Sequence, residues 1–354
     1  MSVFAYTENM KQLKNTNLSS FTSLRVGGPA KNLVLVDSSR ELLDVLEHDN
    51  SCQHVLGFGC NILVSDQGLP GTTVVVRGGD VEVEDTLIVA DTGVWWDNVV
   101  LTAAQHSLWG LELMSEIPSS VGGAVFGNIA AYGVQISDVL EWVDVYNRKS
   151  HVVTRLAAKE IAFSYRHSSL QDQPDDVILR AAFRLSKTPL HALTYDSAIA
   201  IGEELGLSLD SLGERRKIIV ETRRRAGSIY HFDDPHAERS AGSFFKNPLV
   251  STEQARFLAS FDETGKTLER VEHQSKVHGG DSHRASAAHV LLAAGFSRGQ
   301  RWGQVQLHDR HVLKIVTHDG ATASDVYAVV QEILTTVHNK LDITLETEVK
   351  FLGF

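Results

Sequence analysis

The chain has 354 residues, of which 43% are hydrophobic and 22% are charged. That length exceeds one ordinary core and predicts two or three domains, and the composition is that of a folded globular protein rather than a disordered one. With 33 lysines and arginines against 44 aspartates and glutamates the formal net charge is −11, which repels phosphate backbones and argues against DNA or RNA as a main partner.

Cysteine usage and the N-terminal residues indicate the compartment. Cys52 and Cys60 are the only cysteines, and two thiols can form neither a disulfide framework nor a four-ligand zinc site, so we expect no metal centre. Residues 1–15 lack the basic-then-apolar pattern of a secretory signal, and no apolar run reaches membrane-spanning length. We therefore expect a cytoplasmic protein that does not use a membrane.

The first pattern along the chain is a βαβ unit within residues 24–61. Residues 33–36 and 54–56 read as strands, with Ser38 or Ser39 capping a helix between them. The second strand runs into Gly57-Phe58-Gly59-Cys60-Asn61, where glycines leave N–H groups free to face a phosphate. The dinucleotide fingerprint lacks its third glycine, so an ordinary strand-to-loop turn is the alternative.

Predicted strands at residues 72–76 and 86–90 and a helix at 95–104 precede a glycine-rich stretch. Residues 117–133 contain four glycines and several small residues, so one backbone track has almost no side chains. Ordering such a track costs conformational entropy, and a close partner must compensate for it. A large flat cofactor with a pyrophosphate would do so, and so would tight packing of two backbone segments.

The next patterns are strands at residues 141–147 and 177–185 with a helix near 157–162 between them. Tyr165 and Arg166 follow that helix; the guanidinium could fork onto a carboxylate or phosphate, or the two residues could form a common solvated pair. Helices are predicted at residues 195–205 and 213–225. The latter carries five arginines and a lysine, which is typical of a solvated face.

Residues 240–248 read Ser-Ala-Gly-Ser-Phe-Phe-Lys-Asn-Pro. Gly242 can adopt positive φ or let the backbone approach another group, and it precedes the hydroxyl of Ser243. Phe244 and Phe245 form an apolar anchor after it. A hydroxyl that gives up a proton at a fixed point needs such a frame, whereas a hairpin turn with a buried aromatic pair is the alternative.

The remaining chain predicts helices at residues 252–260 and 285–294, a strand at 312–316 and a long helix that begins in a capping-box-like pattern at Thr322. The last strand is predicted at residues 342–351, with its apolar residues on one face and Glu346, Glu348 and Lys350 on the other. A carboxylate on that face is either solvated or aimed into a cleft, and periodicity does not choose between Glu346 and Glu348.

Six stretches in this order resemble the UDP-N-acetylenolpyruvoylglucosamine reductases, the flavoenzymes that make UDP-N-acetylmuramate for bacterial cell walls: residues 22–30, 57–63, 117–133, 165–168, 240–248 and 345–349. The resemblance covers nearly the whole chain. It implies an α+β fold with an FAD-binding module of the vanillyl-alcohol-oxidase type, built from two α/β subdomains (residues 1–77 and 78–225), and a C-terminal α/β substrate-binding domain (residues 226–354).

The resemblance also implies a reaction and a set of residues. NADPH reduces FAD, the flavin N5 passes a hydride to the enolpyruvyl double bond, and Ser243 protonates the resulting carbanion, while Arg166 and Glu348 polarise the substrate carboxylate and stabilise the enolic intermediate. The implied cofactor-binding residues are Gly57, Gly59, Cys60, Asn61, Ile62, Pro118, Gly122, Gly123, Asn128, Ala130, Gly133 and Tyr165. The implied substrate-binding residues are Arg166, Tyr195, Lys246, Asn247 and His311.

The chain departs from the family pattern at three places. Cys60 stands where the family has serine, Leu170 stands where it has phenylalanine, and the lysine that many relatives place against the nucleotide phosphates is missing from residues 226–231. Arg223, Arg224, Arg225 or Lys246 could substitute for it. Two other functions remain: a different oxidase with the same FAD module, or a non-catalytic protein that binds flavin or a nucleotide sugar. We expect a monomer.

Overall fold

The structure is a computed structural model that describes residues 10–262, 265–269, 271–272 and 282–354. Its chain forms two compact units. Unit 1 comprises Pro29–Gly59, Leu69–Ala237 and the described residues before Leu18, and unit 2 comprises Leu18–Gly28, Cys60–Gly68 and the described part of Glu238–Phe354. The division into domains at residues 77 and 225 stays a prediction.

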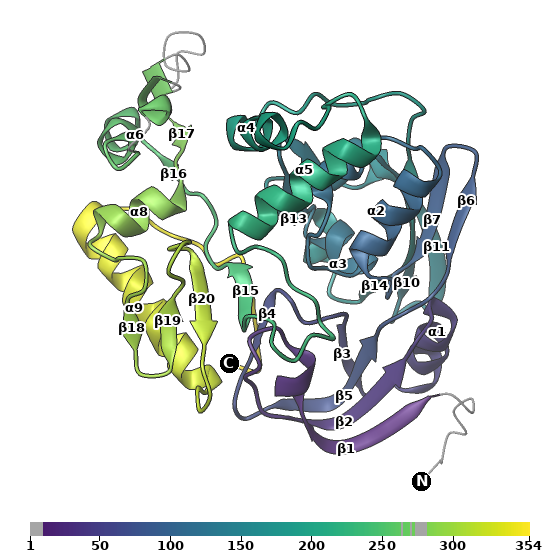
Figure 1. Cartoon of the computed structure of the whole chain (residues 1–354). Coiled ribbons are helices and arrows are strands. Elements are labelled where there is room, and N and C mark those ends of the chain that lie inside the picture. The colour runs from purple at the N-terminus through teal and green to yellow at the C-terminus, as the bar shows by residue number, and fades with distance from the viewer. Residues whose placement is uncertain (1–9, 263–264, 270, 273–281) are drawn as a thin grey trace. The chain divides into compact units, whose positions relative to one another are not determined.

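The first sheet of unit 1 is mixed, with the strand order β1-β2-β5-β3 (Figure 1). Both β2 and β3 pair in parallel with β5, which lies between them. The predicted βαβ unit is confirmed, and the hydroxyl of Ser38 accepts from the N–H of Glu41 to cap α1. The elements are β1 (Lys11–Asn17), β2 (Pro29–Val36), α1 (Ser39–His48), β3 (Cys52–Leu56) and β5 (Leu69–Val76).

The second sheet of unit 1 is antiparallel, with the order β11-β10-β14-β7-β6. The strands predicted at 86–90, 141–147 and 177–185 are confirmed in it. The helix predicted at 157–162 is wrong: a strand ends there and only the short 3-10 helix Ala158–Glu160 follows, because β-branched residues before it favour pairing with β10. The strands are β6 (Val81–Glu84), β7 (Leu87–Asp91), β10 (Leu140–Asn147), β11 (Val152–Ala157) and β14 (Asp176–Arg184).

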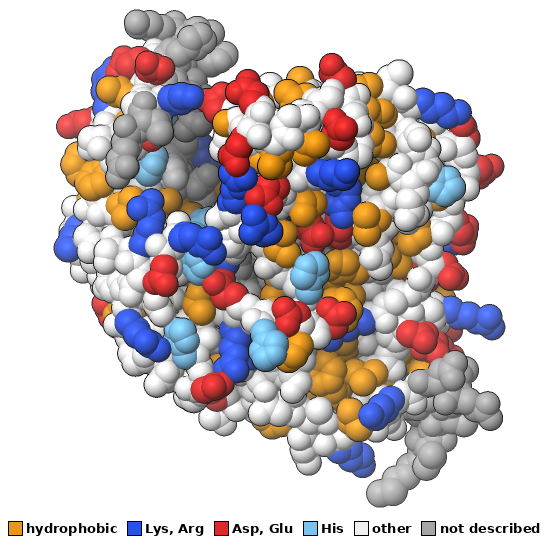
Figure 2. All heavy atoms as spheres, viewed as in Figure 1, with side chains coloured by type: hydrophobic (Ala, Val, Ile, Leu, Met, Phe, Trp, Pro, Cys, Tyr) orange, Lys and Arg blue, Asp and Glu red, His pale blue; other side chains and the backbone are white. Residues whose placement is uncertain are grey.

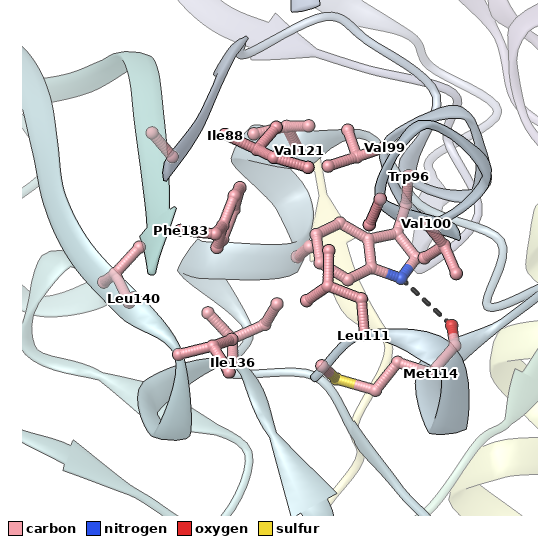
Figure 3. Packing of buried hydrophobic residues seen from close by; sticks show 14 of the residues in the cluster. Ile88, Trp96, Val99, Val100, Leu111, Met114, Val121, Ile136, Leu140 and Phe183 are labelled. Carbon is pink, nitrogen blue, oxygen red and sulfur yellow. Dashed lines mark hydrogen bonds between the residues drawn. The ribbon is translucent and has the colours of Figure 1, made fainter. Parts of the chain in front are cut away.

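Helices complete unit 1 and close its largest core (Figure 3). Trp96 and Phe183 are fully buried there, their ring centroids 5.5 Å apart, and the indole Nε1–H of Trp96 donates to the carbonyl of Met114 at 3.0 Å. The hydrogen bond satisfies the one polar atom of the indole within an apolar environment. The helices are α2 (Trp96–Gln105), α3 (Val121–Phe126), α4 (Asp196–Leu205) and α5 (Leu212–Arg225).

Short elements connect these parts of unit 1. Two small hairpins, β8 with β9 and β12 with β13, carry residues of the predicted site. Their strands are β8 (Ala130–Ala131), β9 (Val134–Gln135), β12 (Phe163–Ser164) and β13 (His167–Ser168), and the 3-10 helices are Glu112–Met114, Ile136–Asp138, Ala158–Glu160 and Ser169–Asp172.

Unit 2 is assembled around a sheet with the order β15-β20-β19-β18 and the long helix α9, whose predicted capping box at Thr322 is confirmed. Its core includes Leu24, Val26 and Leu63 from the two N-terminal segments. The elements are the 3-10 helix Leu18–Phe21, β4 (Ile62–Val64), β15 (Ser240–Ser243), β16 (Leu249–Val250), α6 (Thr252–Ala259), β17 (His283–Arg284), α8 (Ala287–Ala293), β18 (Arg301–Trp302), β19 (Val305–Leu307), β20 (Lys314–Thr317), α9 (Ala323–Leu341) and β21 (Lys350–Leu352).

The predicted last strand is shorter than expected. Only β21 is regular, and it pairs in parallel with β4; before it, Thr347 forms an isolated bridge with Phe245. The predicted orientation is nevertheless confirmed, because Ile343, Leu345 and Val349 are buried in the core of unit 2. The prediction of one continuous strand over 342–351 is wrong because residues 343–346 have no ladder partner there.

Acidic and basic side chains are interspersed rather than gathered by sign on the face seen in Figure 2.

Among the described residues, no helix combines the length and hydropathy needed to cross a bilayer.

Candidate active site

Gly57, at the start of the first predicted cofactor loop, lies against the start of the second. A Cβ at Gly57 would come within 2.6 Å of the Ser120 hydroxyl, and one at Gly122 within 2.0 Å of the Thr92 hydroxyl. Approaches below 3.0 Å leave no room for a side chain. At these two glycines the backbone packs closely against a neighbouring side chain, and the contact at Gly57 brings the loop after β3 next to the start of α3. The choice between a cofactor track and simple backbone packing stays a prediction.

A second contact joins the loop after α3 to the hairpin that carries Arg166. The Ser168 hydroxyl donates to the carbonyl of Phe126 at 2.8 Å, and the Asn128 amide donates to the carbonyl of Ser164 at 3.1 Å. The guanidinium of Arg166 donates to the carbonyl of Ala130 at 3.1 Å. Two sequence blocks more than thirty residues apart thus form one layer of unit 1.

Arg166 occupies the turn between β12 and β13 in a left-handed backbone conformation, φ +56°. This conformation strains the backbone of a non-glycine residue, and such residues cluster at functional sites. Its guanidinium lies 5.7 Å from the centre of the Tyr165 ring. Both residues are half-buried, so the pair is not simply a solvated one.

Asn128 is almost fully buried, at 1% exposure, and its side chain bonds within the protein. Besides Ser164, its amide N–H groups reach the Gln135 side chain at 3.2 Å, and its oxygen accepts from the N–H of Ser137 at 3.1 Å. The side chain therefore holds the loop together, an anchoring role that the sequence did not predict.

Tyr132 and Gly133 form the turn of the β8–β9 hairpin, both at positive φ, as a two-residue hairpin loop requires. The Tyr132 ring meets the half-exposed Tyr195 ring edge-on, with centroids 5.3 Å apart, and Arg223 interacts electrostatically with its hydroxyl. Burial raises the pKa of Tyr132 and lowers the pKa of Arg223. Tyr195, predicted to bind substrate, thus lies against Tyr132, the residue with which half-buried Arg223 interacts.

The prediction that the arginines of α5 form a solvated face is wrong for one side of that helix. Arg215, 4% exposed, pairs with buried Glu112 at 3.2 Å, and Arg216 pairs with Asp97 at 2.6 Å. These arginines lie on the buried face, and each meets an acidic partner from elsewhere in unit 1, which is what makes a buried charge tolerable.

The three arginines in the last turn of α5, which could substitute for the missing phosphate-binding lysine, lie in different environments. Arg224 and Arg225 pair with Glu221 and Glu204 on the surface, as the solvated-face prediction has it. Arg223 instead turns inward, where its guanidinium donates to the carbonyl of Ser228 at 2.8 Å and meets Tyr132.

The start of the second cofactor loop holds a carboxyl pair that the sequence did not reveal. Glu116, two residues before Pro118, has φ +58°, and its N–H donates to Asp97 at 2.7 Å. Burial, the charge of Asp97 and a hydrogen bond between the two carboxyls raise the pKa of Glu116. Nothing in the local sequence pattern brings positions 97 and 116 together.

In unit 2, Ser243 ends a strand that contains a bulge. β15 pairs with β20 through Ser240 opposite Val316 and Ser243 opposite Lys314, so that two residues face the single residue Ile315. Gly242, in the bulge, has φ +74°, the conformation that the sequence predicted for it. A bulge of this kind re-aims the side chain that follows it.

The aromatic pair after Ser243 is the predicted anchor. Phe244 and Phe245 are 0% and 2% exposed, and the N–H of Phe244 donates to the carbonyl of Leu313 at 2.8 Å. The buried pair of the alternative interpretation is confirmed as well. Ser243, the last residue of β15, lies opposite Lys314 on the ladder and so shares a face of the sheet with it.

The structure distinguishes the two glutamates near the C-terminus. Glu346 is exposed and pairs with Lys246 at 3.1 Å. Glu348 is half-buried; its N–H donates to the carbonyl of Phe244 at 2.9 Å, and its carbonyl accepts from the Asn61 amide at 3.2 Å. Glu348 therefore lies beside the residue that follows Ser243, together with Asn61 of the first cofactor loop.

The other predicted residues of unit 2 form hydrogen bonds within that unit. The Asn247 side chain accepts from the N–H of Ala287 at the start of α8, at 2.9 Å. The Nδ1 atom of His311 accepts from the N–H of Leu313 at 3.3 Å, and burial lowers the pKa of His311. Half-buried Cys60 precedes β4, in which Ile62 pairs with Lys350. Arg166 belongs to unit 1 and Ser243 and Glu348 belong to unit 2, so their convergence stays a prediction.

Comparison with known proteins identifies both halves of this arrangement. Residues 30–155 match the FAD binding domain family, and residues 234–352 match the C-terminal domain of UDP-N-acetylenolpyruvoylglucosamine reductase. An FAD-binding domain followed by this C-terminal domain defines a flavin-dependent oxidoreductase and confirms the expected fold class and cofactor.

Curated relatives identify the particular family. A UDP-N-acetylenolpyruvoylglucosamine reductase of Thermobifida fusca is 33% identical over 96% of this chain and 98% of its own, and one of Mycobacterium marinum is 32% identical over 95% and 94%. The chain belongs to the UDP-N-acetylenolpyruvoylglucosamine reductase family. The crystal structure of the reductase from Thermus caldophilus shares the fold, with a TM-score of 0.66 and 24% identity over 98% of this chain and 99% of that one.

Proposed function

We propose that the protein reduces UDP-N-acetylenolpyruvoylglucosamine to UDP-N-acetylmuramate with NADPH, as a cytoplasmic monomer in peptidoglycan precursor synthesis. The observation that carries the proposal is the frame of Ser243: a bulge with left-handed Gly242 before it, buried Phe244 after it and the backbone of Glu348 beside it. All of these residues lie within residues 234–352, which match the C-terminal domain of the reductases.

The residues of the two predicted loops, and of the hairpin that carries Tyr165, fit a bound FAD. Gly133 has open space where a Cβ would lie, whereas Gly57 and Gly122 pack directly against the hydroxyls of Ser120 and Thr92. Backbone tracks without side chains let a pyrophosphate and a flat ring approach closely. We assign the cofactor to residues of these loops: Gly57, Gly59, Cys60, Asn61, Ile62, Pro118, Gly122, Gly123, Asn128, Ala130, Gly133 and Tyr165. When bound, FAD takes a hydride from NADPH and supplies it to the enolpyruvyl double bond.

Ser243 supplies the second hydrogen of the reduction. Hydride addition to one carbon of the double bond leaves a carbanion on the carbon that bears the carboxylate, and the Ser243 hydroxyl gives its proton to that carbon. A serine is a weak acid in water, so the step needs a fixed hydroxyl and a site from which water is excluded. The serine is left as an alkoxide and regains a proton from solvent.

Arg166 and Glu348 act on the substrate carboxylate in this proposal. The guanidinium, already held by the carbonyl of Ala130, offsets the negative charge that spreads onto the carboxylate in the enolic intermediate. Glu348 acts on the same group, and it must be protonated or hydrogen-bonded there, since an unpaired ionised glutamate would repel the carboxylate. Tyr195, Lys246, Asn247 and His311 complete the substrate site.

An oxidase of alcohols or hydroxy acids is disfavoured by the match of residues 234–352 to the reductase C-terminal domain. A protein that binds but does not turn over would be yellow and would consume no NADPH when the UDP-sugar is added. Substrate-dependent NADPH oxidation by the purified protein separates these functions.

Replacing the serine tests the mechanism. Ser243→Ala is expected to keep flavin reduction by NADPH at the wild-type rate and to abolish formation of UDP-N-acetylmuramate, because only the proton donor is lost. Stopped-flow absorbance of the flavin measures both half-reactions separately. Ser286→Ala, at the start of α8 where its side chain makes no capping bond, is the matched control. Wild-type product formation by Ser243→Ala would remove this residue from the mechanism.

A further inference from the structure

A buried charged network lies on the same face of the unit 2 sheet as Ser243. Lys314 is 6% exposed, and its ammonium forms an ion pair with Glu238. The other oxygen of Glu238 accepts from Nε2–H of His308 at 2.8 Å, and His308 is 8% exposed. A buried lysine is uncommon, and this one is paired with a carboxylate that His308 also holds.

The strand register places the network relative to the serine. Ile315 faces the core, as do Val305 and Leu307 of the neighbouring strand, so Lys314 faces the other way. Ser243 pairs with Lys314 directly across the β15–β20 ladder. Directly opposed residues of an antiparallel pair have Cβ atoms about 5 Å apart on one face, so Lys314 is the nearest cross-strand neighbour of Ser243.

The remaining partners make the network rigid. The Nδ1 atom of His308 accepts from the N–H of Arg310 at 3.1 Å, which leaves Nε2–H for Glu238, and the N–H of His308 donates to the carbonyl of Lys314 at 2.9 Å. Burial lowers the pKa of His308, which favours this neutral, donating form. Glu238 lies two residues before β15, so the network also holds the entry to the bulge at Gly242.

We propose that Lys314, held by Glu238 and His308, is a positioning residue that tunes Ser243 as a proton donor. The inference rests on the proposed function of Ser243. Loss of the proton turns the Ser243 hydroxyl into an alkoxide, and a cation fixed across the ladder stabilises that anion, while the Glu238 carboxylate moderates the effect. Lys314 does not exchange a proton with the serine. It stabilises the alkoxide by its positive charge, and the β15–β20 ladder holds it in place.

Charge variants of opposite sign test the proposal in the full-length flavoprotein. Lys314→Met removes the cation and leaves Glu238 negative, so reoxidation of the reduced flavin by the UDP-sugar should slow about 10- to 100-fold. Glu238→Gln removes the anion and leaves the cation, so the same step should be as fast as in the wild type or faster. The double variant should fall between the two.

Two further measurements separate charge from structure. Flavin reduction by NADPH and the KM for the UDP-sugar should not change, and the solvent isotope effect on reoxidation should rise in Lys314→Met, because proton donation then limits the rate. Lys340→Met, which removes a lysine that donates to the carbonyl of Ala294 in the same unit, is the control and should behave as the wild type.

Equal losses of activity in Lys314→Met and Glu238→Gln would show that the network only supports the fold and would overturn the proposal. Wild-type reoxidation by Lys314→Met would overturn it too. A wild-type protein that fails to reduce the UDP-sugar at all would instead contradict the proposed function, so the two failures are distinguishable.

Discussion

At the scale of single residues, the backbone as much as the side chains defines the proposed catalytic groups. Arg166 is itself in the left-handed conformation, and Ser243 follows a glycine in that conformation. Each side chain is thus aimed by a local departure from regular structure, one at a hairpin turn and one at a bulge. A substitution that leaves the chemistry of the side chain intact can still misplace it there.

The missing phosphate-binding lysine leads to a residue-scale prediction about α5. Arg223→Met should raise the KM for the UDP-sugar about 10-fold or more, since the cation that interacts with Tyr132, the neighbour of Tyr195, is lost. Steady-state kinetics measure the KM, and thermal melting shows whether the variant is folded. Arg224→Met, whose arginine pairs with Glu221 at the surface, should change the KM less than twofold. Equal effects of the two variants would argue against a binding role for Arg223.

Some residue roles could be predicted from the sequence and others could not. The positive φ of Gly242 and the buried Phe244 and Phe245 follow from local pattern, which is visible in a short window. The contacts of Asn128 and the pairing of Lys314 with Glu238 join segments 36 and 76 positions apart. No short-range pattern encodes such pairs, because the fold alone brings them together.

At the scale of elements, the longest periodic segments were predicted best. α9 was expected from its capping box and apolar stripe, and Val326, Val329, Val330, Ile333 and Val337 are buried as that stripe requires. The prediction failed near residues 157–162, where a run of only six residues let sheet pairing outweigh helix propensity. Long helices are predicted more reliably because their apolar residues repeat at helical spacing over several turns.

The start of α9 depends on a residue that its own sequence does not contain. Asp66, from the segment before β5, accepts from the N–H groups of Ala323 and Ser324 at 2.9 and 2.8 Å and from the Ser324 hydroxyl at 2.6 Å. Burial opposes the charge on Asp66, but the hydrogen bonds from Ser324 and Ala323 outweigh it and lower the pKa of the carboxyl. The carboxylate therefore acts as a second cap.

Asp66→Ala is expected to lower the free energy of unfolding by about 1 kcal/mol at neutral pH, because two N–H groups of α9 lose their acceptor. A carboxyl whose pKa is lowered by folding stabilises the protein above its unfolded pKa, and that contribution is lost as the pH falls through the folded pKa. The difference from the wild type should therefore vanish in acid. Urea unfolding at neutral pH and below pH 4 measures it; a difference that persists unchanged in acid would contradict the assignment.

At the scale of the whole molecule, unit 2 is not one continuous stretch of sequence. It takes Leu18–Gly28 and Cys60–Gly68 from the N-terminal part of the chain. The hydroxyl of Thr317 donates to the carbonyl of Leu24 at 2.5 Å, and the N–H of Ser65 donates to the carbonyl of Leu352 at 2.8 Å. The resemblance to a family predicted a C-terminal domain from residue 226 onward; contributions from distant segments could not be read from local composition.

A fragment of residues 238–354 should therefore fail to fold cooperatively, although it spans nearly all of the matched C-terminal domain. It lacks the buried side chains of Leu24, Val26 and Leu63, each contributing about 1.5–3 kcal/mol, which together approach the whole stability of a small domain. It also lacks β4, the partner of β21, and the Asp66 cap. Circular dichroism during urea titration tests this, with the full chain as control; a sharp transition in the fragment would show that the N-terminal segments are dispensable for unit 2.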